Sequence, residues 1–426
     1  MKHLLRLFHF EGYETSDVRI SYKQANVTID LNTLPDKPFK CYRCGKFLST
    51  KRGQHRMRIK ELSIMGMACF VRFWRRKGHC TGCKKARSEH IEFLAKESPH
   101  MSQRYAWWIG AMCEIAAESR VAELIKENKM TVMRVDHARL RRMLKHYKIP
   151  DVEWISVDEV YARKKPRCKG ENRDKRFFTI ISDLKSHRVI WVSESRSKSA
   201  LDEFFQLIGK KRSEGIRIVA MDQHEPYRAS VREYCPNAQV VWDRFHLMQS
   251  FNEVANELRK EIFTYSNKSD PIRVLARPKY KYLFLKKDSK RTPQEKEHLQ
   301  EAMKKNEPLL KLELIKERYH SFFQETSLDR AWDIFDEIGD WVDELGYAPL
   351  QRWWQSLEKN WDTLKNFFLT RVSSALSEGQ NNVIKTLKRR AYGYRNMEHF
   401  KLKVLQVCGY LNSRYIKDPS DLISLS

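Results

Sequence analysis

The sequence has no apolar run long enough to cross a bilayer. Its N-terminus also lacks the continuous apolar core of a signal peptide, because Arg6 and His9 interrupt the short apolar patch. We therefore expect a cytoplasmic protein with no membrane partner. The nine cysteines are an odd number, which argues against a disulfide framework. In a reducing compartment, thiols bind metal or lie buried.

Acidic residues are scarce relative to basic ones: 54 Asp and Glu stand against 81 Lys and Arg, a formal net charge of +27. Such an excess says little about the fold but much about the partners of the protein. Nucleic acid is the commonest polyanion, so we expect a nucleic-acid partner and not a merely basic protein. The length of 426 residues allows about two to four domains, and the plentiful aromatic residues allow sizeable cores.

The N-terminal third holds two Cys-x-x-Cys pairs, namely Cys41 with Cys44 and Cys80 with Cys83. The two thiolates of each pair can bind one tetrahedral Zn²⁺, and two pairs complete a four-thiolate site. Alternating apolar residues before and between the pairs predict strands. Residues 1–97 are therefore interpreted as a β segment followed by a structural zinc ribbon. Gly45 and Gly82 are expected to be its turn residues.

Residues 98–150 change to a helical apolar period. Ser102, Ser119 and Thr131 are candidate N-caps for three helices. Three short helices with a basic last helix indicate a helix-turn-helix, which lays its recognition helix in the major groove. The residues assigned to DNA contact in this module are Arg134, Arg141 and Arg142. The alternative is a plain helical linker whose basic face is solvated.

The segment 151–246 has a pattern of three strands, helix, strand, helix, strand. This is the element order of the ribonuclease H fold, in which the first and fourth strands are neighbours. Asp158 lies within the first strand and Asp222 ends the fourth, so the fold would set the two carboxylates side by side. Adjacent carboxylates repel each other, and a divalent cation relieves that cost. Taken alone, Asp222 could equally be a helix N-cap.

Residues 247–370 are predicted to be a helical insertion. Residues 371–426 begin with a further helix, on which Glu378 and Asn382 are one turn apart on the same face. This helix continues into a basic, aromatic patch suited to nucleic acid, whose assigned cations are Lys385, Lys388, Arg389, Arg390 and Arg395. A solvated basic helix is the alternative. The chain as a whole is predicted to be a multidomain α/β protein.

Four features carry a family resemblance that spans nearly the whole chain: the paired cysteines, VDE at 157–159, MDQHEPY and PNAQVVWDRFHL at 221–227 and 236–247, and SEGQNNVIKTLKRRAYGYRN at 377–396. They resemble the ISL3 family of bacterial insertion-sequence transposases. The resemblance implies a ribonuclease H-like core in which two aspartates and one glutamate hold Mg²⁺ (or Mn²⁺), namely Asp158, Asp222 and Glu378. Asp243 and His246 match an Asp-x-x-His signature and, with Asn382, are expected to support the site.

The resemblance also implies a DNA transposase that binds the ends of an insertion sequence and uses two-metal chemistry for strand cleavage and transfer. We expect double-stranded DNA as the partner, both terminal inverted repeats and target, and a homodimer or larger assembly at the nucleoid. Two other hypotheses stay open: an inert, transposase-derived regulator, and a ribonuclease H-like nuclease without strand transfer. Glu159 is a rival metal ligand, but it should face away from Asp158, because side chains alternate along a strand.

Overall fold

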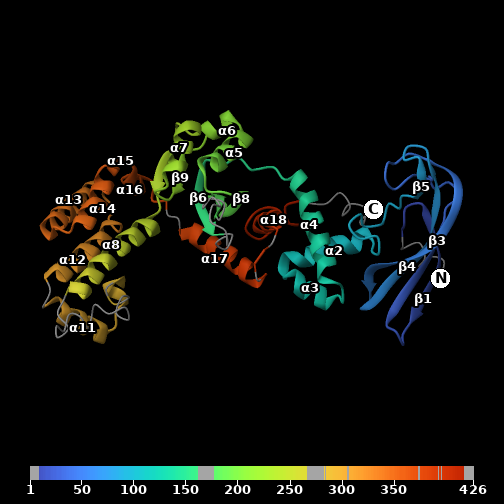
Figure 1. Ribbon diagram of the computed structural model, residues 1–426, viewed down its shortest axis with the longest axis horizontal. Coiled ribbons are helices and arrows are strands. Elements are labelled where there is room, and N and C mark those ends of the chain that lie inside the picture. The colour runs from blue at the N-terminus through green and yellow to red at the C-terminus, as the bar shows by residue number, and fades with distance from the viewer. Residues whose placement is uncertain are drawn as a thin grey trace. The chain divides into compact units, whose positions relative to one another are not determined.

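The computed structural model describes residues 9–161, 177–265, 283, 285–304, 307–372, 375–391, 393–394 and 396–416, with the backbone alone for residues 263, 301, 302 and 375–378. The chain divides into two compact units, residues 1–148 with 387–426, and residues 149–386 (Figure 1). This division cuts the predicted segment 371–426 within its helix. Among the described residues, no helix combines the length and apolar character needed to cross a membrane.

A five-stranded sheet forms the base of the first unit, in the order β1-β2-β4-β3 with β5 paired to β4 (Figure 1). Its strands are β1 (Tyr13–Ser21), β2 (Asn26–Thr33), β3 (Leu48–Ile64), β4 (Met67–Cys80) and β5 (Lys85–Ser88). The β2–β4 pair is parallel and the others are antiparallel. Alternate side chains such as Ile29, Val71 and Phe73 are fully buried on one face. The opposite face of the sheet carries mainly polar and charged residues, together with Phe70 and Trp74.

The described residues of the first unit also form the helices α2 (Gln103–Ile115), α3 (Glu118–Leu124), α4 (Lys129–His146) and α18 (Met397–Cys408). Ser102 caps α2 as predicted, because its side chain accepts a hydrogen bond from the first turn. The predicted caps Ser119 and Thr131 are wrong. Helix α3 begins after Ala117, and α4 begins after Asn128, whose side-chain oxygen accepts from the backbone of the first turn.

Helix α18 lies against α2 and α4 through buried polar contacts. The ammonium of Lys403 donates to the carbonyl of Cys113 at 2.8 Å and to Asp136 at 3.1 Å. Glu398, at the start of α18, accepts from Arg141 of α4 at 2.8 Å. Residues near the C-terminus are thus part of the same unit as the predicted helix-turn-helix.

The second unit is built on a sheet in the order β10-β9-β6-β7-β8 (Figure 1). Its strands are β6 (Trp154–Tyr161), β7 (Phe177–Asp183), β8 (Arg188–Ser193), β9 (Ile218–Met221) and β10 (Gln239–Trp242). Strands β6, β9 and β10 are parallel, whereas β7 is antiparallel to both β6 and β8. The first and fourth strands of this unit are therefore neighbours, as the sequence predicted. The connecting helices are α5 (Lys198–Ile208), α6 (Lys210–Glu214) and α7 (Glu225–Tyr234).

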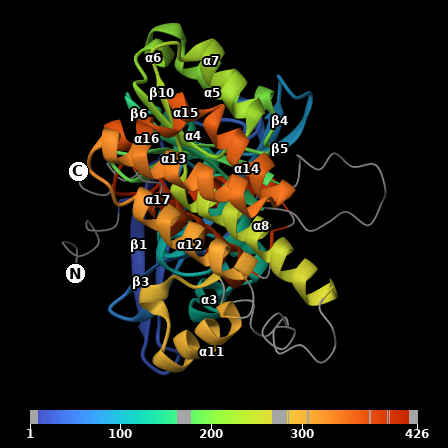
Figure 2. The ribbon, with the colours of Figure 1, turned by 90° about the vertical axis from the view of Figure 1, so that its left-hand side faces the viewer.

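A helical bundle follows β10 in the second unit, and Figure 2 shows α8, α12, α13 and α14 side by side. Its elements are α8 (Arg244–Tyr265), the short helix η3 (Asp288–Lys290), α11 (Pro293–Met303), α12 (Glu307–Phe322), α13 (Leu328–Leu345), α14 (Ala348–Glu358), α15 (Trp361–Leu364) and α16 (Asn366–Thr370). Aromatic rings form its core, with the Phe335 and Trp354 ring centroids 4.3 Å apart. Burial of each such ring stabilises the fold by about 1.5–3 kcal/mol. Helix α17 (Ala375–Arg390) comes next.

Candidate active site and cysteine centre

Three aspartates occupy equivalent positions on adjacent parallel strands: Asp158 lies within β6, and Asp222 and Asp243 directly follow β9 and β10. Val157 of β6 and Trp242 of β10 both pair with Met221 of β9. The next residue along each strand is an aspartate, which gives the set Asp158, Asp222 and Asp243. The carboxyl ends of parallel strands are where open α/β sheets gather functional groups.

His246 lies between two of these aspartates, on the first turn of α8. Its Nδ1 atom is 2.6 Å from Asp222 Oδ1 and 3.0 Å from Asp243 Oδ2. Burial alone would lower the pKa of His246, but its hydrogen bonds to both carboxylates raise that pKa to about 10. The imidazole thus fixes the orientation of Asp222 and Asp243 relative to each other.

Asp158 is a buried carboxyl group with few favourable charges around it. Burial and then the negative charge of Asp222 raise the pKa of Asp158 to about 6. Two donors act against this rise: the backbone N–H of Glu159 at 2.6 Å and the Asn381 side-chain amide at 2.7 Å. A carboxylate in this setting gains stability from a nearby cation.

Helix α17 is held against the sheet by two adjacent side chains. Gln380 accepts from the Ser182 hydroxyl at 2.6 Å and donates to the His187 carbonyl at 2.7 Å. Asn381 donates to Asp158 Oδ2 at 2.7 Å. These contacts join α17 to β6, β7 and the turn before β8.

The structure therefore brings together Asp158, Asp222, Asp243 and His246 from the predicted set, and it adds Gln380 and Asn381. Asn382, which was expected to support the site, is exposed. Glu378 lies in α17, but its side chain is outside the described residues. The sequence offered no signal for choosing Asn381, because residues three and four positions after Glu378 both share its helix face.

Glu159, the rival ligand, has a different partner. Arg196 Nη1 lies 3.3 Å from Glu159 Oε1. Successive side chains of a strand point to opposite faces, so Glu159 and Asp158 have different neighbours. Asp158 lies with Asp222 and Asp243, and Glu159 does not.

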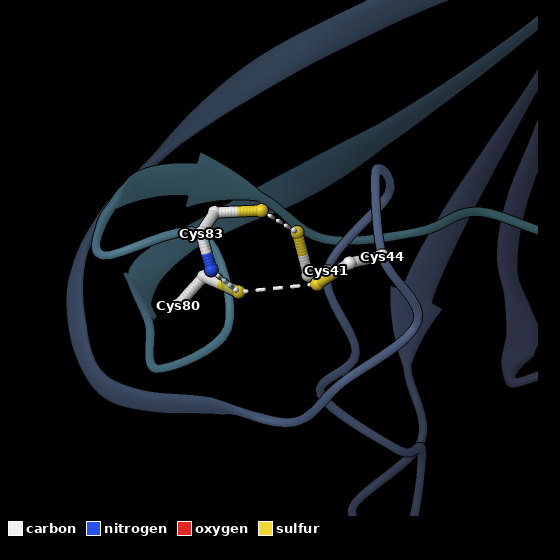
Figure 3. Close-up of side chains that lie close together, drawn as sticks. All are labelled: Cys41, Cys44, Cys80 and Cys83. Atoms are coloured by element: carbon white, nitrogen blue, oxygen red, sulfur yellow. Dashed lines mark hydrogen bonds between the residues drawn. The ribbon is translucent and has the colours of Figure 1, made fainter.

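The four cysteines of the two Cys-x-x-Cys pairs converge at one point (Figure 3). All four Sγ atoms lie within 4.8 Å of one another, with 3.4 Å between Cys44 and Cys80 and 4.0 Å between Cys41 and Cys83. Tetrahedral zinc with Zn–S bonds of about 2.3 Å separates its sulfurs by about 3.8 Å. A backbone N–H from Cys83 lowers the pKa of the Cys80 thiol to about 7. The donor set and its size therefore fit one Zn²⁺.

The turns of the two knuckles differ from the sequence prediction in one respect. The residue after the second cysteine of each pair has a left-handed backbone, with φ of 73° at Gly45 and 51° at Lys84. Gly82 does not. A Cβ atom at Gly82 would instead lie 3.3 Å from the Cys44 sulfur and 2.7 Å from the Lys46 side chain. Gly82 is needed for space beside the sulfurs, not for turn geometry.

Two of the three arginines assigned to DNA contact on α4 are bound to carboxylates of the same unit. Arg141 pairs with Glu398, and Arg142 Nη1 lies 2.6 Å from Glu97 Oε1. Arg134 is exposed. Of the three assigned arginines, Arg141 and Arg142 are therefore balanced by carboxylates within the protein.

The cations assigned to the end of α17 remain at the surface. Lys385, Arg389 and Arg390 are exposed, and Lys388 is partly buried. Arg395 lies outside the described residues. Asn381 and Lys385 lie about one turn apart on the same helix. The basic residues of α17 therefore begin one turn after the residue that contacts Asp158.

Comparison with known proteins gives matches over most of the chain. Residues 155–404, more than half of the chain, match the ISL3 family, described as "Transposase". The chain is 25% identical over 368 residues to the transposase for insertion sequence element IS1001 of Bordetella parapertussis, covering 85% of this chain and 87% of that protein. It is 27% identical over 106 residues to the transposase for IS1557 of Mycobacterium tuberculosis, 25% of this chain and 22% of that protein.

The matches define the class of the protein, which is a DNA transposase, an enzyme that cleaves DNA and transfers the strands. The chain belongs to the ISL3 family of transposases. Membership in this family implies the use of a divalent metal and the binding of insertion-sequence DNA.

Proposed function

We propose that Asp158, Asp222 and Glu378 hold divalent cations, Mg²⁺ or Mn²⁺, and catalyse strand cleavage and strand transfer at the ends of an insertion sequence. The observation that supports this most directly is the 2.7 Å hydrogen bond from Asn381 Nδ2 to Asp158 Oδ2. Residues three apart share one face of a helix. Because position 378 of α17 lies one turn before Asn381 on that helix face, the contact supports our assignment of Glu378 as the third acid.

A ribonuclease H-like core is the fold we infer for residues 151–246 with α17. The strand order β10-β9-β6-β7-β8, with its second strand antiparallel, supports this inference. The helices from α8 to α16 then form an insertion between the last strand and the helix that carries the third acid. Asp158 and Asp222 directly follow the paired residues Val157 of β6 and Met221 of β9, which supports a metal site shared by the two aspartates.

The ligand set fits hard divalent cations. Carboxylate oxygens are the donors that Mg²⁺ prefers, and water and phosphate complete its shell. When bound, a pair of such ions activates the attacking oxygen and stabilises the leaving one in an in-line displacement. Asp158 and Asp222 position the site from the rigid sheet, and His246 holds Asp222 in place. Asn381 orients Asp158 from the helix side.

The parts outside this site have distinct tasks in the proposal. The four cysteines hold one structural Zn²⁺, because a four-thiolate site of this size suits zinc. Residues 1–97 and 98–150 act in recognition of the element ends. The exposed cations of α17 hold the DNA backbone near the carboxylates. An element has two ends, which suits a homodimer or larger assembly on DNA.

A two-step assay with the full-length protein tests the proposal. Cleavage is measured on DNA that carries an element end, and strand transfer is measured with a pre-cut 3′-hydroxyl end and a plasmid target. Asp158→Asn, Asp222→Asn and Glu378→Gln should each abolish both steps and leave DNA binding intact. Asp362→Asn, which changes a carboxylate that is 90% exposed in the same unit, is the matched control. Cleavage by Glu378→Gln at a near wild-type rate would show that Glu378 is not a catalytic residue. Cleavage by the wild type without joining of the 3′-end to the target would show that the protein is a nuclease and not a transposase.

A further inference from the structure

The polar face of the first unit's sheet is rich in arginine. Because β3 and β4 pair in register, Arg56 is opposite Trp74 and Arg58 is opposite Arg72. Side chains of directly paired residues lie on the same face of a sheet. Arg19 of β1 belongs to the same face, since it pairs with Thr28, two residues from Asp30. We call this set of outward residues on β1, β2, β4 and β3 the arginine face.

Three guanidinium groups of the arginine face converge on one carboxylate. Asp30 accepts from Arg72 at 2.7 and 2.9 Å, from Arg56 at 3.4 Å, and from Arg19. One carboxylate cannot balance three cations, and the arginines remain accessible: the side chains of Arg19 and Arg56 are 54% and 53% exposed. With Arg58 added, four arginines stand against three carboxylates of the face, Asp30, Asp17 and Glu14. Lys60, on the same face, pairs with Glu127 outside the sheet.

Aromatic side chains are interleaved with these arginines. The guanidinium carbon of Arg58 is 3.7 Å from the centroid of the Phe70 ring, a stacked cation–π contact that fixes its plane. Trp74 is 45% exposed, although large aromatic side chains are usually buried. Arginines fixed by stacking, beside an exposed tryptophan, are suited to bind a planar or phosphate-bearing partner.

Helix α4 offers a weaker surface in the same unit. There, Arg139, Arg141 and Arg142 each pair with a separate glutamate, one to one. Arg139 is also fully buried. Each of these three arginines is therefore balanced by its own carboxylate, whereas three arginines of the arginine face share Asp30.

We propose that the arginine face binds the phosphate backbone of double-stranded DNA, with Arg56 and Arg58 as its principal contacts. Charge complementarity selects a polyanion, and the proposed function supplies DNA as the polyanion that the protein must hold. The proposal thus rests on DNA being the substrate, but not on the identity of the catalytic acids. Contacts to phosphate position a protein on DNA and carry no sequence information.

Salt-dependent binding by the full-length protein tests the proposal. Affinity for an element-end duplex and for a random duplex is measured at several salt concentrations without added Mg²⁺ or Mn²⁺ and without a chelator, so that no cleavage occurs and the zinc of the cysteine site stays bound. The variants are Arg56→Ala/Arg58→Ala and the charge-preserving Arg56→Lys/Arg58→Lys. The control is Lys210→Ala, a lysine on α6 whose side chain is 89% exposed and paired with Glu214. Because the assay contains no Mg²⁺ or Mn²⁺, the result is independent of metal binding at the proposed active site.

Loss of two phosphate contacts should make the slope of log affinity against log salt shallower by about 1.8 for both duplexes. The fall in affinity between about 50 and 200 mM salt then becomes roughly 12-fold smaller than for the wild type. The Arg56→Lys/Arg58→Lys variant should keep most of the slope, since lysine retains the charge, and Lys210→Ala should keep all of it.

Two outcomes would overturn the proposal. The first is a wild-type slope for Arg56→Ala/Arg58→Ala, which would mean that the arginine face does not touch DNA. The second is an equal loss in the lysine variant, which would show that these arginines act through folding and not through charge. The slope of log affinity against log salt is also measured for Asp158→Asn. Because this substitution tests the catalytic proposal and leaves the arginine face intact, failure of one proposal can be told apart from failure of the other.

Discussion

Replacement of Asn381 by alanine isolates the contact that links α17 to the strand-end carboxylates. In the wild type, the Asn381 amide donates to Asp158 Oδ2 at 2.7 Å. The substitution removes this donor and leaves the two Gln380 contacts that hold the same helix turn. Helix α17 should therefore stay in place, while Asp158 loses the group that orients it.

The size of the effect follows from the kind of bond that is lost. A hydrogen bond to a charged group contributes about 1.5–3 kcal/mol, which corresponds to roughly 10- to 150-fold in rate. Asn381 is partly exposed, so water can replace part of the bond. We therefore expect the cleavage rate to fall roughly 10- to 30-fold, near the lower end of that range.

Single-turnover cleavage of an element-end duplex at saturating protein measures this effect, with Mn²⁺ varied to obtain the half-saturating concentration. Asn381→Ala should lower the rate and raise the Mn²⁺ requirement, with DNA affinity unchanged. Asn382→Ala is the matched control, because Asn382 is the adjacent, exposed residue of the same type. A wild-type rate for Asn381→Ala, or an equal loss for Asn382→Ala, would refute the assignment of α17 to the active site.

Three further predictions concern the surrounding parts. Cys80→Ser should reduce the zinc content measured by mass spectrometry from one ion per chain to none and unfold the module, because metal binding supplies folding energy there. Lys403→Met should lower the stability of the first unit by about 3–5 kcal/mol in denaturant titration, because it leaves Asp136 buried without its cation, and Asp136→Asn in the same chain should recover part of the loss. Replacing Arg389 and Arg390 by alanine should weaken binding to element-end and random DNA equally in a filter assay, because both side chains are exposed on a helix that reaches the active site.

Local sequence patterns predicted the sheet of the second unit and two of its acids. Short apolar runs ending at Asp222 and Asp243 became parallel strands, and the first strand lies next to the fourth. The segment from Thr292 to Glu295 has the sequence pattern of a capping box and forms one: the side chains of Thr292 and Glu295 each accept a hydrogen bond from the backbone N–H of the other residue. These features depend on residues that are close along the chain or on a strongly constrained topology. They can therefore be predicted from a single sequence.

The sequence could not predict which of two similar, nearby residues makes a given contact. Asn128, and not Thr131, caps α4, although both residue types are good caps and both precede apolar helical residues. Asn381, and not Asn382, contacts Asp158, although both lie on the face of Glu378. A helical period of 3.6 residues does not distinguish positions three and four, so the helix's exact rotation against the sheet decided between them.

Pairing between distant charges was equally hidden. The partner of Arg141 is Glu398, 257 positions away, and Lys403 binds Asp136 across a similar separation. The sequence shows that α4 is basic, but not that acids from elsewhere balance it. For the same reason it could not show that Arg19, Arg56 and Arg72 share a single carboxylate, Asp30, which leaves the sheet with unbalanced positive charge.

The most direct test of the central claim is the number of Mn²⁺ ions that the full-length protein binds in the presence of a pre-cut element end, counted by electron paramagnetic resonance. If Asp158, Asp222 and Glu378 form one metal site, the wild type and Asp362→Asn should bind the same number of ions, and Glu378→Gln should bind at least one fewer. Wild-type Mn²⁺ binding by Glu378→Gln would contradict the account, because it would show that α17 does not supply the third acid.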